Sequence, residues 1–357
     1  MEYSIGKRSN IVENTFQKPI NSKFGHNTTA MQIVKGLDFA GKNVVITGGY
    51  AGMGLETTKA LASIGANILV LARDTKRAKH NLKKIPNIEV EYFDLLKPDI
   101  INTFSEKYIS TDKPIHVLIN HAGIINVPKL TKDIRGYEYQ FATNHLGHFA
   151  LTAKLFPALI KANGARVIEV SSRGHRLGGI IFDDINFEKT EYTGMRAYAQ
   201  SKTANVLFAL KLNEIGEKHN IKAFSVHPGP VPSSEIFAAS LVGIAPNVQI
   251  SLIRFLSKIM RGFHLTEFLN MLRKSKIKHE GDLFKTIQQG AATTVWCATN
   301  TDLNDIGGVY CEDCNIAKTV SADSNEPFGV RPWAIDPEMA NRLWEISEKM
   351  TGIKFVV

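Results

Sequence analysis

The sequence Asn43-Val-Val-Ile-Thr47 is followed at once by Gly48-Gly-Tyr-Ala-Gly52-Met-Gly54. The first five residues have the composition of a buried strand, and residues 55–64 have the apolar spacing of a helix. Glycines in this position let a pyrophosphate approach the backbone, and the end of the helix supplies free N–H donors. The stretch predicts a strand–turn–helix unit that binds phosphate, although a tight turn alone would also explain the glycines.

Further short apolar runs follow at intervals along the chain, and helical patterns lie between them. This alternation is typical of α/β proteins rather than of helix bundles or β-sandwiches. We therefore expect one doubly wound α/β domain with a parallel sheet. The strands expected after the first lie at residues 67–71, 90–93, 117–119, 166–170 and 222–226.

Composition narrows the class of protein. The chain has 357 residues, 44% of them hydrophobic, which is enough for a substantial core. Three cysteines do not make a disulfide framework, so we expect a reducing, cytoplasmic setting. No signal peptide and no membrane span is recognisable. The net charge of +9 permits an anionic partner, but no nucleic-acid-binding motif accompanies it.

The end of the second expected strand bears on the choice of dinucleotide. NAD sites commonly place an acid there to bind the adenosine ribose. Here Ala72 is followed by Arg73, whose guanidinium suits a 2′-phosphate. We therefore expect NADP in preference to NAD, although Asp74 comes next and Arg73 could simply be solvated.

Polar or small residues also follow the other expected strands. Asp94 could meet the adenine edge or cap a helix. The small residues of Asn120-His-Ala-Gly123 could let the backbone lie along the cofactor, and Asn120 could pin the sheet edge. Three prolines stiffen the loop after residue 227, as a wall beside a nicotinamide requires.

Tyr198 and Lys202 have the spacing that places two side chains on one face of a helix. An ammonium group beside a tyrosine favours the phenolate and lowers its pKa toward neutrality. Ser172 follows the strand at 166–170, and Asn144 is a polar residue in an apolar helical pattern. Each of these features alone arises often by chance, but together they predict a hydride-transfer site.

The chain resembles the short-chain dehydrogenase/reductase family over residues 38–233 and again near 287–318. Thr47-Gly48-x-x-x-Gly52-x-Gly54 is similar to its cofactor motif, and Asn120-His-Ala-Gly123 to its Asn-Asn-Ala-Gly. His121 departs from the usual asparagine, and Ser233 replaces the threonine of Pro-Gly-x-x-x-Thr. The fit is best with retinol dehydrogenase-like members of the soluble bacterial type, through Ser171-Ser-Arg-Gly-His175, Ala197-Tyr-x-x-Ser-Lys-x-Ala-Asn205 and residues 308–314.

The resemblance implies an NADP-dependent oxidoreductase that interconverts an alcohol and a ketone or aldehyde, with Tyr198 as general acid/base. In reduction, Ser172 hydrogen-bonds the substrate oxygen, Lys202 tunes Tyr198 and grips the nicotinamide ribose, and Asn144 holds a relay water. The alternative is a non-catalytic NADP(H)-binding or scaffold protein on the same fold. The expected cofactor-binding residues are Gly48, Tyr50, Gly52, Met53, Gly54, Arg73, Asp94, Leu95, Asn120, Ala122, Gly123, Tyr198, Lys202, Pro228, Gly229, Val231 and Ser233.

The expected organisation is a polar N-terminal extension (1–37), a Rossmann-type domain (38–320) and a C-terminal extension with an amphipathic helix (321–357). Residues 234–286 are expected to form a helical substrate lid, with lipid or subunit contact as alternatives because basic residues line one face of its helical pattern. Cys311 and Cys314 lack a second pair of ligands, so we expect no metal site. The expected partners are a small alcohol or carbonyl substrate of lipophilic character and further copies of the chain in a dimer or tetramer.

Overall fold

The computed structural model describes residues 17–232 and 283–355. Its centre is an eight-stranded sheet in the order β3-β2-β1-β4-β5-β6-β7-β8. All neighbouring strands are parallel except β7 and β8, which form an antiparallel hairpin. The strands are β1 (Asn43–Thr47), β2 (Asn67–Ala72), β3 (Ile88–Tyr92), β4 (Val117–Asn120), β5 (Arg166–Val170), β6 (Lys222–His227), β7 (Val309–Glu312) and β8 (Asn315–Ile316).

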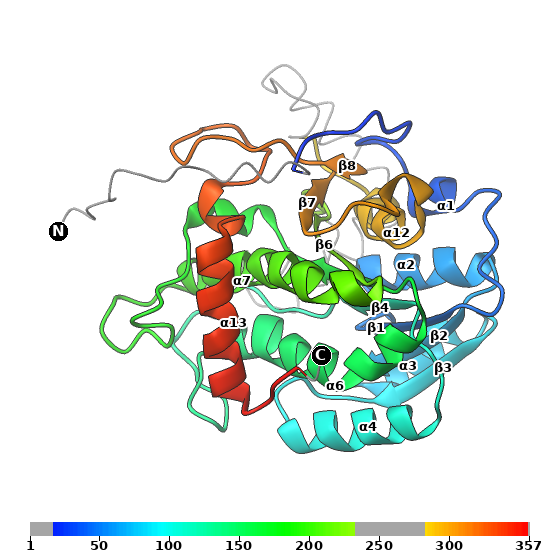
Figure 1. The fold of residues 1–357 in the computed structure, drawn as a ribbon, viewed down its shortest axis with the longest axis horizontal. Helices are drawn as coiled ribbons and strands as arrows, with labels where there is room; N and C mark the ends of the chain where they lie inside the picture. Colours follow the sequence, from blue (N-terminus) through cyan, green and yellow to red (C-terminus); the bar gives the residue numbers. More distant parts are fainter. Residues whose placement is uncertain (1–16, 233–282, 356–357) are drawn as a thin grey trace.

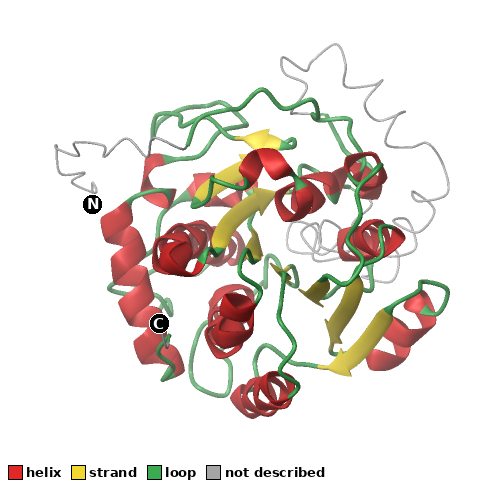
Figure 2. Cartoon of the chain, turned by 45° about the vertical axis from the view of Figure 1, so that its right-hand side comes forward, coloured by secondary structure: helices red, strands yellow, loops and turns green. Residues whose placement is uncertain are grey.

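Helices cover both faces of the sheet (Figures 1 and 2). One face carries α1 (Ala30–Ile33), α2 (Gly52–Ser63), α3 (Thr75–Leu82), α11 (Ile287–Gly290) and α12 (Ala292–Thr299). The other carries α4 (Pro98–Ser110), α6 (Gly147–Lys161) and α7 (Gly194–Gly216), and α13 (Pro337–Thr351) packs on α7. The short α5 (Tyr139–Phe141) and a π-helix, η1 (Ala142–Leu146), precede α6. This arrangement confirms the doubly wound α/β fold, and α13 lies in the C-terminal part of the chain.

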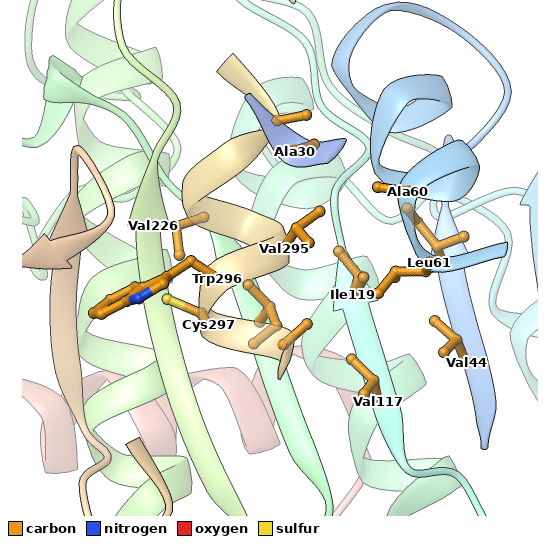
Figure 3. Close-up of a cluster of buried hydrophobic side chains, with 14 of the residues drawn as sticks. Ala30, Val44, Ala60, Leu61, Val117, Ile119, Val226, Val295, Trp296 and Cys297 are labelled. Atoms are coloured by element: carbon orange, nitrogen blue, oxygen red, sulfur yellow. The ribbon is translucent and has the colours of Figure 1, made fainter. Parts of the chain in front are cut away.

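The central strands β1, β4 and β6 are buried on both faces because helices cover both faces of the sheet. On the α2 and α12 side, Trp296 and Cys297 of α12 point to the strands, and Leu61 of α2 belongs to the same buried cluster as Ile119 and Val44 (Figure 3). Trp296 is fully buried, and its truncation to alanine is expected to cost about 3–5 kcal/mol. This core holds the strands in register, and therefore holds their carboxyl ends at one edge.

Part of the N-terminal extension packs on this framework. Gln17 donates from Nε2 to the carbonyls of Tyr310 and Ala317 at 3.0 and 2.6 Å. Thr29 and Gln32 form a capping box at the start of α1, which contributes Ala30 and Ile33 to the core. In the described residues, no helix has the length and hydropathy needed to cross a membrane.

The expected substrate lid falls almost entirely on residues 233–282, outside the part of the chain that the structure describes. Ser233 lies outside it as well. The three cysteines are free and buried against the core, two of them in the β7–β8 hairpin.

Candidate active site at the carboxyl edge of the sheet

The glycine-rich turn has the backbone that its sequence predicts. Gly48 and Gly52 have φ values of +71° and +53°, which side chains other than glycine rarely adopt. At Gly54 an added Cβ would lie 2.5 Å from the Gly48 carbonyl oxygen. No side chain caps the first N–H groups of α2, which begins at Gly52. The turn therefore leaves backbone donors and space for a phosphate at the helix end.

Thr47 joins this turn to the segment after β4. Its Oγ1 accepts hydrogen bonds from the backbone N–H groups of His121 and Ala122 at 2.9 and 3.0 Å. Gly123 then passes close to Asn144 and Lys202: an added Cβ would lie 3.2 Å from Asn144 Oδ1 and 3.4 Å from Lys202 Nζ. The small residues after β4 thus bring the chain alongside the polar groups of the site.

The side-chain amide of Asn120 forms hydrogen bonds inside the protein. It is fully buried, and its Nδ2 donates to Thr152 Oγ1 at 2.9 Å and to Glu169 Oε1. Its Nδ2 fixes β4 to β5 and α6, while its Oδ1 has no hydrogen-bond partner among the described residues.

Arg73 is exposed directly after β2. Asp74 is occupied, because its Oδ1 accepts from Arg77 N at 2.9 Å and caps α3. Arg77 lies over the ring of Tyr50 at 5.9 Å from its centroid, so a second arginine stands near the glycine turn. Asp94 Oδ1 accepts from the Leu96 N–H at 3.0 Å and does not cap α4.

The loop after β6 faces the glycine turn across α11. An added Cβ on Gly290 would lie 2.7 Å from Val231 Cγ2 and 2.8 Å from Met53 Sδ. Gly229 has a φ of +88° and packs on the side chain of Lys285. Met53 and Val231, far apart in sequence, are therefore brought together.

Tyr198 and Lys202 lie on α7 and are both buried. The ring of Tyr198 packs over Gly174, where an added Cβ would lie 2.9 Å from Tyr198 Cε1, and its hydroxyl hydrogen-bonds Ser172. Lys202 Nζ donates to the Val170 carbonyl at 2.8 Å and lies 5.8 Å from the centroid of the Tyr198 ring. These three residues lie together at the carboxyl ends of the strands.

The pKa of Tyr198 corrects one sequence-based expectation. We expected the Lys202 ammonium to lower it, but burial raises the pKa of Tyr198 to about 12, and the hydrogen bond from Ser172 only partly offsets this. Lys202 stands over the ring and bonds to a backbone carbonyl, so desolvation outweighs its attraction for a phenolate. Burial also lowers the pKa of Lys202 to about 8.

Asn144 lies in the π-helix η1, a form that recurs at functional sites. Its side chain bonds to the Ile124 N–H and C=O at 2.9 and 3.0 Å and donates to Ser201 Oγ at 2.9 Å. Its carbonyl oxygen accepts from His148 Nδ1 at 3.1 Å. A relay water at Asn144 would therefore have to donate to the remaining lone pair of Asn144 Oδ1 or of its backbone carbonyl oxygen.

Glu169 is a residue that the sequence argument passed over. Its carboxyl is fully buried in β5 beside Asn120, and burial raises its pKa to about 8. The nearby Glu169 charge in turn raises the pKa of Lys202 against the effect of burial. The sequence could have pointed to Glu169, because a glutamate inside the apolar run Arg166–Val170 would be a charge in a buried strand, and such a charge needs a partner.

Residues 42–240 match the family model for short chain dehydrogenases. Mouse retinol dehydrogenase 12 is 32% identical over 85% of this chain and 88% of its own length. A probable oxidoreductase of Streptomyces antibioticus is 32% identical over 87% of this chain and 97% of its own length.

Among solved structures, an uncharacterized protein from Mycobacterium paratuberculosis has a TM-score of 0.66 and 27% identity, and the match covers 93% of this chain and all of that one. The Pseudomonas aeruginosa RhlG/NADP complex, with a TM-score of 0.55 and 18% identity over 77% of this chain and 95% of that one, shares the fold. The chain is therefore an enzyme of the short-chain dehydrogenase/reductase family, and its similarity extends to the retinol dehydrogenase-like members.

Proposed function

We propose that the chain is an NADP-dependent oxidoreductase that interconverts an alcohol and a ketone or aldehyde, with Tyr198 as the general acid/base. The observation that carries the proposal is the meeting of Tyr198, Ser172 and Lys202 at the edge that also carries the glycine-rich turn. NADPH, when bound, supplies the hydride. The uncapped start of α2 and the glycines at 48 and 54 fit its pyrophosphate.

In the reductive direction negative charge grows on the substrate oxygen. Ser172 donates a hydrogen bond to that oxygen, and Tyr198 transfers a proton to it. A pKa of about 12 keeps Tyr198 protonated at neutral pH, which suits a proton donor. Lys202 holds positive charge close by and reaches the segment at Gly123, where it can also bind a ribose hydroxyl. Asn144 anchors residue 124 and offers its remaining lone pairs to a relay water.

The preference for NADP rests on Arg73. Its neighbour Asp74 is bound to the start of α3, so Arg73 is the charged residue left at the end of β2 to meet a phosphate. In a cell, NADP use would favour reduction. The RhlG/NADP complex has the same fold, but sequence identity of 18% is too low to carry cofactor choice across.

The test is oxidation of NADPH with a panel of ketones and aldehydes, followed at its near-ultraviolet absorbance. We expect the wild type to turn over at least one carbonyl compound and Tyr198→Phe to lose a factor of about 10²–10⁴ in kcat. Tyr108→Phe is the matched control, because Tyr108 bonds Pro114 O at 3.4 Å at the opposite edge of the sheet. Equal rates for wild type and Tyr198→Phe across the panel would favour the non-catalytic, cofactor-binding alternative.

A further inference from the structure

Two buried histidines lie next to Ser172 and Asn144, and the proposed reaction leaves both without a role. His175 follows Ser172 by three residues, and His148 follows Asn144 by four. Both side chains are fully buried. Each ring bonds the backbone carbonyl of the site residue that precedes it, at 2.8 Å for His175 and 3.1 Å for His148.

The partners of His175 fix its tautomer. Nδ1 faces the carbonyl oxygen of Ser172, which can only accept, so Nδ1 carries the proton. Nε2 lies 3.4 Å from the backbone N–H of Arg331, which can only donate, so Nε2 carries none. The ring also packs against Tyr310 at a tilt of 59°, with centroids 4.7 Å apart. His175 is therefore the neutral Nδ1–H form, and it links Ser172 to the segment before α13.

His148 has the same pattern with different partners. Nδ1 donates to the Asn144 carbonyl, and Nε2 lies 2.9 Å from Thr47 Oγ1. Because Nε2 has no proton, the Thr47 hydroxyl donates to it. The lone pairs of Thr47 Oγ1 then remain free to accept from the N–H groups of His121 and Ala122. One imidazole thus joins the π-helix, the glycine turn and the segment after β4.

The surroundings keep both rings uncharged. Burial lowers the pKa of His175 to about 4, against the bond to Ser172, and Arg331 and Arg176 lower it further. Tyr310, beneath the ring, stays a neutral phenol because burial raises its pKa.

Burial likewise lowers the pKa of His148 to about 3, opposed by the bond to Asn144 and assisted by Lys202 and His121. His145, on the preceding turn, is also neutral, because burial lowers its pKa to about 3.

We propose that His175 and His148 are positioning residues that hold the backbones of Ser172 and Asn144 through neutral Nδ1–H imidazoles. The proposal rests on the proposed function only for its kinetic consequence. The bond from His175 to the Ser172 carbonyl keeps the Ser172 hydroxyl oriented toward Tyr198. The bond from His148 to the Asn144 carbonyl keeps the Asn144 side-chain amide bonded to residue 124. Neither imidazole transfers a proton in the reaction.

His145 is an internal control. Its Nε2 lies 2.7 Å from Ser347 Oγ, whose own proton goes to the Leu343 carbonyl at 2.7 Å. Nε2 of His145 must therefore be the donor, which is the opposite tautomer. The structure thus assigns one neutral tautomer to His175 and His148 and the opposite one to His145.

The first test is a multiple-bond ¹H–¹⁵N NMR spectrum of the intact protein labelled with ¹⁵N-histidine, which needs no substrate. We expect neutral Nδ1–H patterns for His175 and His148 and an Nε2–H pattern for His145, all three constant between pH 6 and 8. Loss of single signals in His175→Asn, His148→Gln and His145→Gln assigns them. An Nε2–H or protonated form of His175 or His148 would overturn the proposal.

The second test is kinetic. His175→Phe keeps a ring against Tyr310 but loses both bonds, and we expect kcat to fall at least about tenfold with NADPH affinity unchanged. His175→Asn restores a donor toward Ser172 and should recover most of the rate. Trp333→Phe is the matched control, because Trp333 Nε1 bonds the His175 carbonyl at 2.9 Å and not its ring.

The positioning role is wrong if His175→Phe stays within twofold of the wild type, if Trp333→Phe loses as much, or if His175→Asn recovers nothing. Should the wild type reduce no carbonyl compound, the proposed function fails while the NMR result still decides the assignment of the two rings. The same spectrum decides it if His175→Phe does not fold.

Discussion

At the amino-terminal edge of the sheet, Arg166 begins β5 with its guanidinium bonded to the carbonyls of Cys297 and Asn300, each at 2.8 Å, and to Asn304 Oδ1 at 2.7 Å. At the carboxyl edge, four residues later, Val170 accepts from Lys202, and Ser172 meets Tyr198. Both edges are polar and partly buried. They differ in what their polar groups bind.

The donors of Arg166 go to partners within the chain, as a structural residue requires. Near the carboxyl edge several buried atoms among the described residues have no hydrogen-bond partner, among them His121 Nδ1, Asn120 Oδ1 and Glu169 Oε2. Unpaired buried atoms also occur elsewhere in the described residues, such as Ser105 Oγ on α4 and His219 Nε2 just before β6, so they do not by themselves mark a functional edge. We propose that the amino-terminal edge stabilises the sheet and that the carboxyl edge carries the chemistry, as in other doubly wound folds.

The largest expected effect is a difference in kcat between variants of two lysines at opposite edges of the sheet. Lys202→Met removes the ammonium beside Tyr198, and we expect kcat for carbonyl reduction to fall about 10²–10⁴-fold. Lys222→Met, at the start of β6, should leave kcat within twofold, because Lys222 lies at the far edge. Steady-state rates of the two variants check this, and similar losses in both would break the comparison.

Arg166→Met should have its effect on stability instead. The substitution leaves two carbonyls and an amide oxygen without their charged donor, and we expect the free energy of unfolding to fall by about 3 kcal/mol. Urea unfolding measures that change. The kcat of the folded variant should equal that of the wild type; a lower kcat at unchanged stability would contradict the structural role.

Arg73→Ala tests whether the carboxyl edge distinguishes NADPH from NADH. Loss of a charge-assisted bond to the 2′-phosphate should weaken NADPH binding about 10- to 100-fold and leave NADH binding unchanged. Fluorescence titration with both dinucleotides measures the two affinities. If the wild type binds NADH more tightly than NADPH, the argument from Arg73 is wrong.

The pH dependence should be the most gradual effect. Burial lowers the pKa of Lys202 to about 8, so its ammonium is present below that pH and is lost above it. We therefore expect kcat/KM for reduction to fall with rising pH from about pH 8, approaching tenfold per pH unit. A profile that stays flat up to about pH 10 would mean that Lys202 keeps an ordinary lysine pKa or that its charge is not needed.

The sequence predicted the fold well, because the fold depends on local pattern, and it named Ser172, Tyr198 and Lys202, which the structure places close together. The apolar run before Gly48 and the alternation of strand and helix follow from burial on both sheet faces. Tyr198 and Lys202 share a face because of helical spacing. These features need no knowledge of distant partners.

What the sequence did not predict depends on contacts between distant segments. The raised pKa of Tyr198 follows from burial under neighbouring elements, and the roles of His175 and His148 depend on Arg331 and Thr47. The partners of the Asn120 amide, Glu169 and Thr152, also lie far away in the sequence. Such pairings join residues 32 to 156 positions apart, which no local pattern encodes.

Hydrogen–deuterium exchange of the intact protein with and without NADPH tests the central claim most directly, because it reports both edges in one experiment. The account predicts slower exchange on binding in peptides that contain residues 47–55, 120–124, 171–175 and 227–231. It predicts no change in peptides at 164–167, 220–222 and 300–305. Protection confined to these last three segments would contradict the assignment of the carboxyl edge as the active site.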